Sequence, residues 1–137
     1  MKILILVLVT GVGLMGCAHG MTQYMPKEIG NDYCSVNIMR RSNIVGSPTA
    51  IILDKRIIAH LGAGEYITFP LKSGIHTLSV KAGAYNTLEL NYDFEPNCIK
   101  YFLVSPGWSS RIELEELSQN EGLNEIKHYQ KLKEERQ

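Results

Sequence analysis

The feature that most constrains the fold is a two-residue alternation of apolar and polar side chains, which recurs in short segments between residues 34 and 117. Successive side chains of a strand point to opposite faces, so this period is typical of strands with one buried face. Turn residues separate the segments about every 8 to 12 residues, a spacing typical of sandwiches and small barrels. The expected strands are Cys34–Arg40, Ala50–Leu53, Arg56–Leu61, Glu65–Pro70, Ile75–Lys81, Asn86–Phe94, Ile99–Val104 and Arg111–Leu117.

The connections between these segments are too short to hold helices. No helical pattern of about 10 to 15 residues lies between them, which excludes a parallel α/β sheet. Asp54-Lys55 predicts a two-residue hairpin turn, although Lys55 stands where glycine is usual. Residues 33–117 are therefore expected to form an all-β domain, an antiparallel sandwich of seven to eight strands.

The alternation ends at Ser118, where a different signal begins. Ser118 and Glu121 have the spacing of a capping box, in which each side chain accepts from the other residue's backbone amide. Apolar residues then recur three apart from Leu123 to Leu132. Residues 118–137 are expected to form a C-terminal helix whose first turns dock on the sandwich, followed by a solvated, frayed tail.

The N-terminal segment has the order of a secretory signal: Lys2, then an uncharged run from Ile3 to Met15. This run is shorter than the roughly 20 apolar residues that a membrane-spanning helix needs. Its last residues and the next two, Leu14-Met15-Gly16-Cys17, resemble the bacterial lipobox. The resemblance implies a lipoprotein signal peptide at 1–16, cleavage after Gly16, and a diacylglycerol and an amide-linked acyl chain such as palmitate on Cys17. The alternatives are an ordinary cleaved signal with a chance cysteine, or a buried N-terminal helix.

Lipidation would decide where the protein is located. Each buried methylene of an acyl chain contributes about 0.8 kcal/mol, and two chains are enough for stable anchoring. Ala18 follows Cys17, and by analogy with enteric bacteria this favours the outer membrane, on its periplasmic face. Residues 17–32 show neither period and are expected to be a lipidated tether with a span of roughly 20 Å.

Once Cys17 carries lipid, the remaining cysteines are Cys34 and Cys98. In an oxidising compartment two such cysteines are expected to form a disulfide. Two buried free thiols or a metal pair are the alternatives, and the chain has no CxxC spacing to support a metal site.

The balance of charge limits the class of partner. The chain has 14 Lys and Arg and 14 Asp and Glu. A nucleic-acid-binding protein would need a basic excess gathered in a stripe or patch, so nucleic acid is not an expected partner.

Three segments suggest a family. The segments are Asp54–Leu61, Gly64–Ile67 and Gly74–Val80. Together they resemble a recurrent unit of small bacterial lipoproteins with PEGA-like domains, in which a strand, a Gly-x-Tyr step and a Gly-x-His strand form a meander. The resemblance spans about residues 36 to 126 and implies a PEGA- or transthyretin-like sandwich. It implies no activity and no catalytic residues, and Lys55 and Lys72-Ser73 depart from the family's turn residues.

A search for catalytic and metal-binding patterns finds little. His76 shares a strand face with Leu78 and Val80 and is expected to be a hydrogen-bonded residue at the edge of the core. His60, His76 and Asp54 could converge as metal ligands, or as a base and the group that orients it. The chain has no nucleophile elbow, phosphate loop or HExxH motif. We expect no cofactor and no metal, and a solvated strand edge at the glutamates Glu113, Glu115 and Glu116.

Trp108 is the most suggestive single residue, in the loop Ser105–Ser110. Exposed aromatic side chains on loops are frequent binding anchors, but a loop tryptophan can also cover one end of a sandwich. Tyr85 could join it if the two loops share an end. The sequence thus predicts a non-catalytic, membrane-anchored interaction or structural domain that meets an envelope protein or cell-wall glycan. The alternative is a small envelope hydrolase or metal-binding protein.

Overall fold

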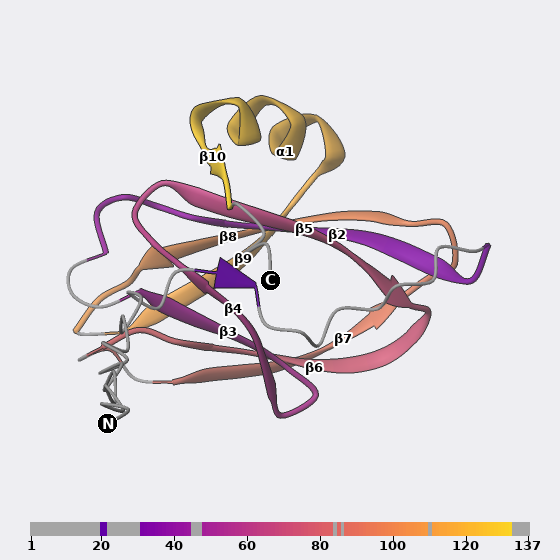
Figure 1. Ribbon diagram of the computed structural model, residues 1–137, viewed down its shortest axis with the longest axis horizontal. Helices are drawn as coiled ribbons and strands as arrows, with labels where there is room; N and C mark the ends of the chain where they lie inside the picture. Colours follow the sequence, from indigo (N-terminus) through magenta and orange to yellow (C-terminus); the bar gives the residue numbers. More distant parts are fainter. Residues whose placement is uncertain are drawn as a thin grey trace, which may run out of the picture.

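The computed structural model describes residues 20–21, 31–44, 48–83, 85, 87–109 and 111–132. Two sheets face each other, and a short helix lies outside one of them (Figure 1). The expected all-β sandwich is confirmed. Residues 1–16, Cys17 and residues 133–137 lie outside the described residues.

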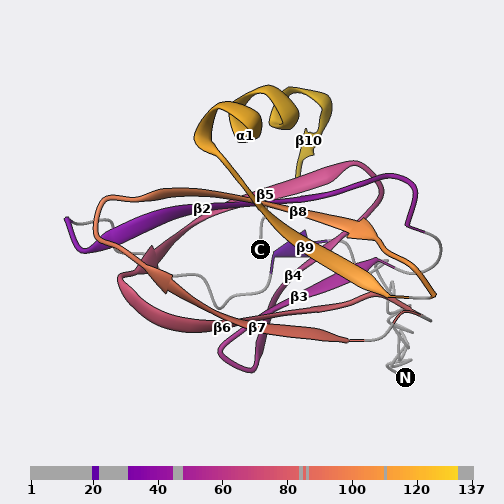
Figure 2. The same ribbon diagram turned by 180° about the vertical axis from the view of Figure 1, so that it is seen from behind.

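The first sheet has the strand order β1-β4-β3-β6-β7. Its strands are β1 (Gly20–Met21), β3 (Thr49–Leu53), β4 (Arg56–Leu61), β6 (Gly74–Lys81) and β7 (Leu88–Phe94). The second sheet has the order β10-β5-β2-β8-β9. Its strands are β2 (Tyr33–Arg40), β5 (Glu65–Lys72), β8 (Ile99–Pro106), β9 (Ile112–Leu117) and β10 (Gln130–Lys131). Seen from behind, the two layers stay separate along their length (Figure 2).

The sequence had led us to expect antiparallel pairing throughout, but two strand pairs are parallel. β2 lies parallel to β8, and β10 lies parallel to β5. β2 crosses over to the first sheet through the connection to β3, so its neighbour β8 comes from much later in the chain and runs in the same direction. Both strands therefore start at the same end of the sandwich.

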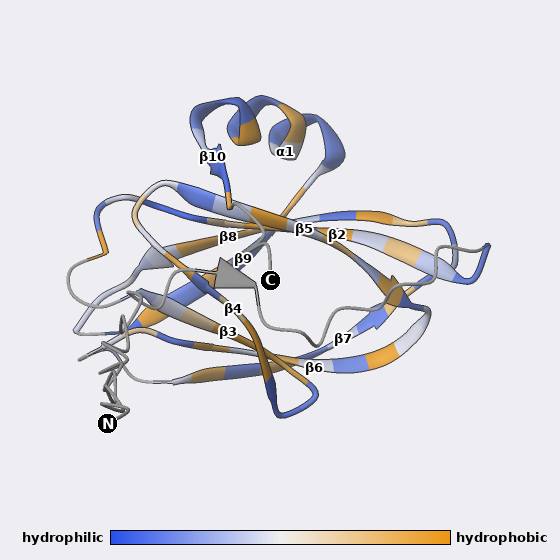
Figure 3. Cartoon of the chain, viewed as in Figure 1, coloured by the Kyte–Doolittle hydropathy of each residue, from blue (hydrophilic) through white to orange (hydrophobic). Residues whose placement is uncertain are grey.

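The core fills the space between the sheets. Inward side chains from both layers are almost fully buried, including Ile38, Ile51, Leu78 and Phe102. Hydropathy drawn on the cartoon shows apolar positions alternating with polar ones along the strands (Figure 3). This core accounts for the two-residue period, because each strand contributes every second side chain to it.

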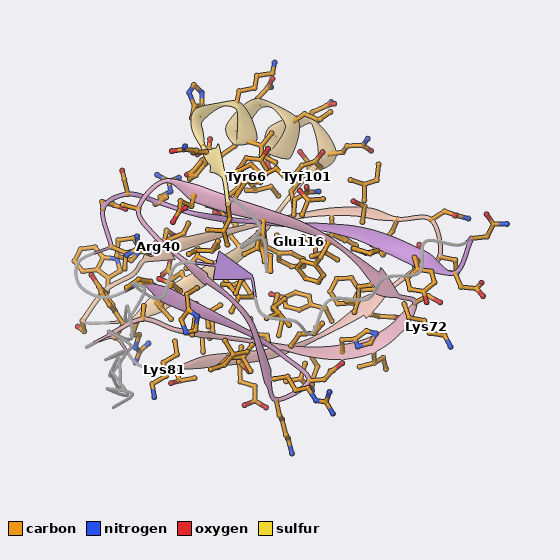
Figure 4. The ribbon with its side chains drawn as sticks, in the orientation of Figure 1. Arg40, Tyr66, Lys72, Lys81, Tyr101 and Glu116 are labelled. Carbon is orange, nitrogen blue, oxygen red and sulfur yellow. A yellow bond between two sulfur atoms is a disulfide. The ribbon has the colours of Figure 1, made fainter. Side chains whose placement is uncertain are left out.

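A second, smaller apolar cluster lies on the outer face of the second sheet. Met39, Tyr101 and Leu103 are buried there, and the side chains of Ile126 and Tyr129 pack against them. Tyr66 and Tyr101 lie on the side of the sheet that faces the helix (Figure 4). The helix thus buries apolar side chains that a bare sheet would expose.

The C-terminal region begins as expected but continues differently. Helix α1 (Gln119–Glu125) begins at the predicted capping box of Ser118 and Glu121. It is shorter than predicted, because a 3₁₀ turn (Ile126–His128) follows and the backbone becomes extended at Tyr129, with φ −116° and ψ 153°. β10 then pairs with β5. Leu132 is only 4% exposed and belongs to the main core, so it is not part of the solvated tail that we expected from Lys131 onward.

The expected tether also contains an ordered contact. Gly20 and Met21 pair with His60 and Ala59 of β4 in antiparallel register. Residues 17–32 are therefore not a featureless linker, because this short strand fixes the chain against the edge of the first sheet three residues after Cys17.

Candidate contact site at the hairpin end

The two ends of the sandwich carry different groups. We call the end that holds the turn between β8 and β9 the hairpin end. β2, β4 and β6 finish there, and β3, β5 and β9 begin there. We call the opposite end, where β2 and β8 begin, the disulfide end. Arg40 and Lys81 lie toward the hairpin end, and Lys72 lies toward the other (Figure 4).

Trp108 lies in the turn of the β8–β9 hairpin and is 88% exposed. β8 extends to Pro106, so the loop is shorter than predicted. The amide of Gly107 donates to the carbonyl of Arg111 at 2.7 Å, and the amide of Arg111 donates to the carbonyl of Trp108 at 3.1 Å. Ser109 takes the left-handed conformation, with φ 53°. The turn is closed by its own backbone bonds, and its indole covers no part of the core.

Gly107 lies close to the side chain of Glu113 in this hairpin. A Cβ added there would lie 2.8 Å from the Glu113 carboxylate oxygen and 2.9 Å from Glu113 Cγ. The Glu113 side chain therefore lies over the backbone just before Trp108.

Tyr85 lies at the same end, in the loop between β6 and β7, but in a different setting. Its side chain is partly buried and packs against the main core. Its backbone amide donates to the carbonyl of Ala82 at 2.8 Å. Tyr85 is thus part of the cover of the core, and Trp108 is the aromatic residue that this end offers to solvent.

A buried cation lies beneath these loops. Arg40 is 2% exposed, its Nε donates to Thr49 Oγ1 at 2.7 Å, and its Nη2 donates to the carbonyl of Ile44 at 3.0 Å. Burial lowers the pKa of the Arg40 guanidinium, and the carboxylate of Glu65 and the hydroxyl of Tyr85 act in the opposite direction. Arg40 ties the end of β2 to the start of β3 and so supports the loops of the hairpin end.

The predicted disulfide joins Cys34 and Cys98, whose Cα atoms are 4.5 Å apart. Their parallel strands place Ser35 beside Ile99, and so set the two cysteines next to each other. The bridge fastens the start of β2 to the start of β8, and it confirms the pairing expected from the cysteine count.

The structure brings two of the three predicted polar residues together. His76 Nδ1 lies 2.6 Å from Asp54 Oδ2, and His76 Nε2 lies 2.7 Å from the carbonyl of Lys72. Burial raises the pKa of the Asp54 carboxyl, but bonds from His76 and from the Thr77 amide outweigh it, so the pKa lies below its ordinary value.

This arrangement limits what His76 can do. Both ring nitrogens lie within hydrogen-bond distance of oxygen atoms of the protein, Asp54 Oδ2 and the carbonyl of Lys72. The ring also meets Phe94 edge-on, with 5.9 Å between centroids. His76 is thus the hydrogen-bonded residue at the core edge that we expected, and it has no free nitrogen to take a proton from a substrate. His60 lies opposite Ala50, at the other end of β3 from Asp54, so the three do not converge.

A shallow groove of about 360 Å³ lies at the disulfide end. It follows the start of β2 and the final part of β5, and none of its lining residues is charged. The lining residues are Tyr33, Cys34, Ser35, Thr68, Phe69, Pro70, Asn97 and Cys98. Sequence reasoning missed this groove, because only the register of β2 on β5 brings these residues together.

Two further properties apply to the described part of the chain. It contains no group of three or more His, Cys, Asp or Glu side chains placed to hold a metal ion. No helix within the described ranges has the length and apolar character needed to cross a membrane.

The glutamates expected at a solvated strand edge lie on β9, the outermost strand of its sheet. Glu113, Glu115 and Glu116 are all exposed, and Glu116 Oε1 accepts from Lys100 Nζ at 2.7 Å. Charged side chains on an outer strand discourage pairing with other chains. This expectation is confirmed.

Comparisons with protein families and with curated proteins give no relative. No protein-family model matches the chain, and a search of curated proteins finds no match either. The resemblance to PEGA-like lipoproteins stays a prediction.

Proposed function

We propose that this chain is a lipid-anchored protein of the bacterial envelope whose sandwich is a non-catalytic contact domain. In this proposal Cys17 carries the acyl chains, the protein lies at the periplasmic face of the outer membrane, and the β8–β9 hairpin is the contact surface. The observation that carries the proposal is the 88% exposure of Trp108 on a turn closed by its own backbone bonds.

An exposed indole forgoes the free energy that burial of its apolar surface would provide. Fully burying a large apolar side chain contributes roughly 1.5 to 3 kcal/mol. The fold gains nothing of this kind from Trp108, whereas an envelope component that covers the indole would gain it on contact. Large aromatic residues are enriched among the side chains that contribute most to interfaces.

Anchoring is tested at Cys17. Cells that express the Cys17→Ser variant are labelled with radioactive palmitate, and the protein is recovered and compared with the unchanged chain. We expect the label to be lost and the precursor to stay uncleaved. Undiminished label on the variant would refute the lipid anchor.

The contact role is tested by Trp108→Ala in crosslinked envelopes. We expect the variant to lose its crosslinks while its melting temperature stays unchanged, because the indole does not pack on the core. A melting temperature that falls markedly, with crosslinks retained by the folded fraction, would show that Trp108 serves the fold instead.

A further inference from the structure

The proposed lipid anchor and the exposed tryptophan belong to the same end of the sandwich. β1 pairs with β4 so that Gly20 lies opposite His60, near the point where β4 finishes. β1 runs antiparallel to β4, so its first residue, Gly20, is the end of β1 that lies nearer the hairpin end. The position of Cys17 is then limited by its separation from Gly20 along the chain.

The distance that this segment can cover is short. Three residues separate Cys17 from Gly20, and an extended chain advances about 3.4 Å per residue, so Cys17 lies within roughly 10 Å of Gly20. A free tether of the length expected from the sequence would let the domain turn in any direction. A tether docked at β1 restricts the domain to orientations in which the hairpin end is near the lipid.

The strand order sets the distance between Gly20 and Trp108. β5 and β2 lie between the edge near β1 and the β8–β9 hairpin. With strands about 4.8 Å apart and sheets about 10 Å apart, Gly20 and Trp108 lie on the order of 20 Å from each other. The acyl chains and the indole are therefore separate points across one end of the molecule, and two such points can fix its tilt on a surface.

The chemistry of this end suits the surface of a bilayer. Tryptophan is enriched at membrane interfaces, where its apolar ring and its polar N–H both find partners. Arg41, Lys81 and Arg111 are exposed at the same end, and so are Glu89 and Glu113, so charges of both signs surround the indole and the indole itself favours the bilayer. Arg111 belongs to the same turn as Trp108, because its amide donates to the carbonyl of Trp108.

We propose that the hairpin end lies on the membrane that holds the acyl chains, with the indole of Trp108 inserted into the bilayer interface. This inference rests on the proposed lipid anchor and names the component that the hairpin contacts. The acyl chains supply the attachment, and Trp108 sets the orientation, so that the disulfide end faces away from the membrane.

The chain offers a direct test because Trp108 is its single tryptophan. The mature lipidated protein is incorporated into vesicles of phosphatidylethanolamine and phosphatidylglycerol, made with ordinary or with brominated acyl chains. We expect brominated lipid to remove most of the Trp108 emission, and the emission to be shifted to shorter wavelength. Acrylamide in the aqueous phase should quench it weakly.

A matched reporter at the other end supplies the control. Ile75 is 75% exposed at the start of β6, near the disulfide end and roughly 25 Å along the strands from the hairpin. In the double variant Trp108→Phe, Ile75→Trp, brominated lipid should leave the emission unchanged and acrylamide should quench it strongly. Equal quenching by lipid at both positions, or quenching at position 75 alone, would overturn the orientation.

The same samples distinguish the two proposals. Acyl label on Cys17 combined with a water-exposed Trp108 would refute the bilayer contact and leave the anchor standing, with a protein or glycan as the partner. Absence of acyl label from the wild-type protein would instead refute the anchor itself, together with the orientation that depends on it.

Discussion

Replacing Gly122 by alanine tests how helix α1 is seated on the second sheet. Gly122 is buried in the helix, and a Cβ added there would lie 2.1 Å from Cγ of Tyr101 and 2.5 Å from its Cβ and Cδ2. Ordinary contacts begin at 3.4 Å, so helix and ring would have to separate by about 1.3 Å (3.4 − 2.1). Tyr101 is itself only 6% exposed and has little room to withdraw.

Two effects oppose each other in this variant, and their magnitudes decide whether the free energy of unfolding rises or falls. Alanine is favoured over glycine in a helix interior by about 1 kcal/mol. Overfilling a packed site costs typically about 1 to 3 kcal/mol, and an overlap this deep is at the upper end. We expect a net loss of about 1 to 2 kcal/mol in the free energy of unfolding, or a fall of roughly 4 to 16 °C in melting temperature.

The assay is urea unfolding followed by circular dichroism with the disulfide intact. Asn124→Ala is the matched control, because Asn124 is exposed in the same helix, and it should be neutral or slightly stabilising. In a Tyr101→Ala background, Gly122→Ala should cost less, since the opposing ring is gone. A Gly122→Ala variant as stable as the unchanged protein would refute this seating of the helix.

Three further predictions concern separate parts of the fold. Replacing both Cys34 and Cys98 by serine should lower the free energy of unfolding by about 4 kcal/mol, because the bridge closes a loop with a sequence separation of 64; reduced wild-type protein should unfold at the same urea concentration as the variant. Asp54→Asn should destabilise the protein at neutral pH, because ionised Asp54 accepts from His76. Since the pKa of Asp54 is lowered, this loss should shrink as the pH falls below the ordinary value of 3.8; a loss independent of pH would contradict the assignment. Ser118→Ala should cost about 1 kcal/mol by removing the cap of α1, measured by thermal unfolding, and Ser118→Asp should restore it.

Local patterns were enough to predict most of the fold. The β4 boundaries agree with the structure, because polar and glycine residues mark both of its ends. The hairpin turn before it also formed as predicted: Asp54 and Lys55 have φ of 47° and 67°, the left-handed values that such a turn requires. Here the two strands impose the turn although Lys55 is not the usual residue.

The parts that the sequence did not predict depend on contacts between distant residues. Two-residue strands such as β1 and β10 have no period of their own, and only their neighbours β4 and β5 define them. Glycine is an unfavourable residue in a helix, so Gly122 weakens the sequence signal for α1. The structure nevertheless has no space for a larger side chain there, because the ring of Tyr101 lies against it.

The candidate site was predictable in part. The pattern singled out Trp108, but its exposure depends on how the turn closes. The pairing of β3 with β6 brings Asp54 to His76, and no local signal could show this. Arg40 alternates with Val36 and Ile38 on the inward face of β2, a signal that could have identified it as buried.

The two outermost short strands have a consequence for how the chain is made. β1 and β10 come from opposite ends of the described chain, and each extends the same side of the sandwich, where β4 and β5 lie. Leu132 enters the core at this seam, and its amide donates to the carbonyl of Tyr66 at 2.9 Å. In the export that we propose, the chain emerges from its N-terminus onward and can form β4 and β5 early, but the seam stays open until residue 132 has emerged. This core contact thus waits for Leu132, and apolar groups along that seam are left accessible to chaperones until then.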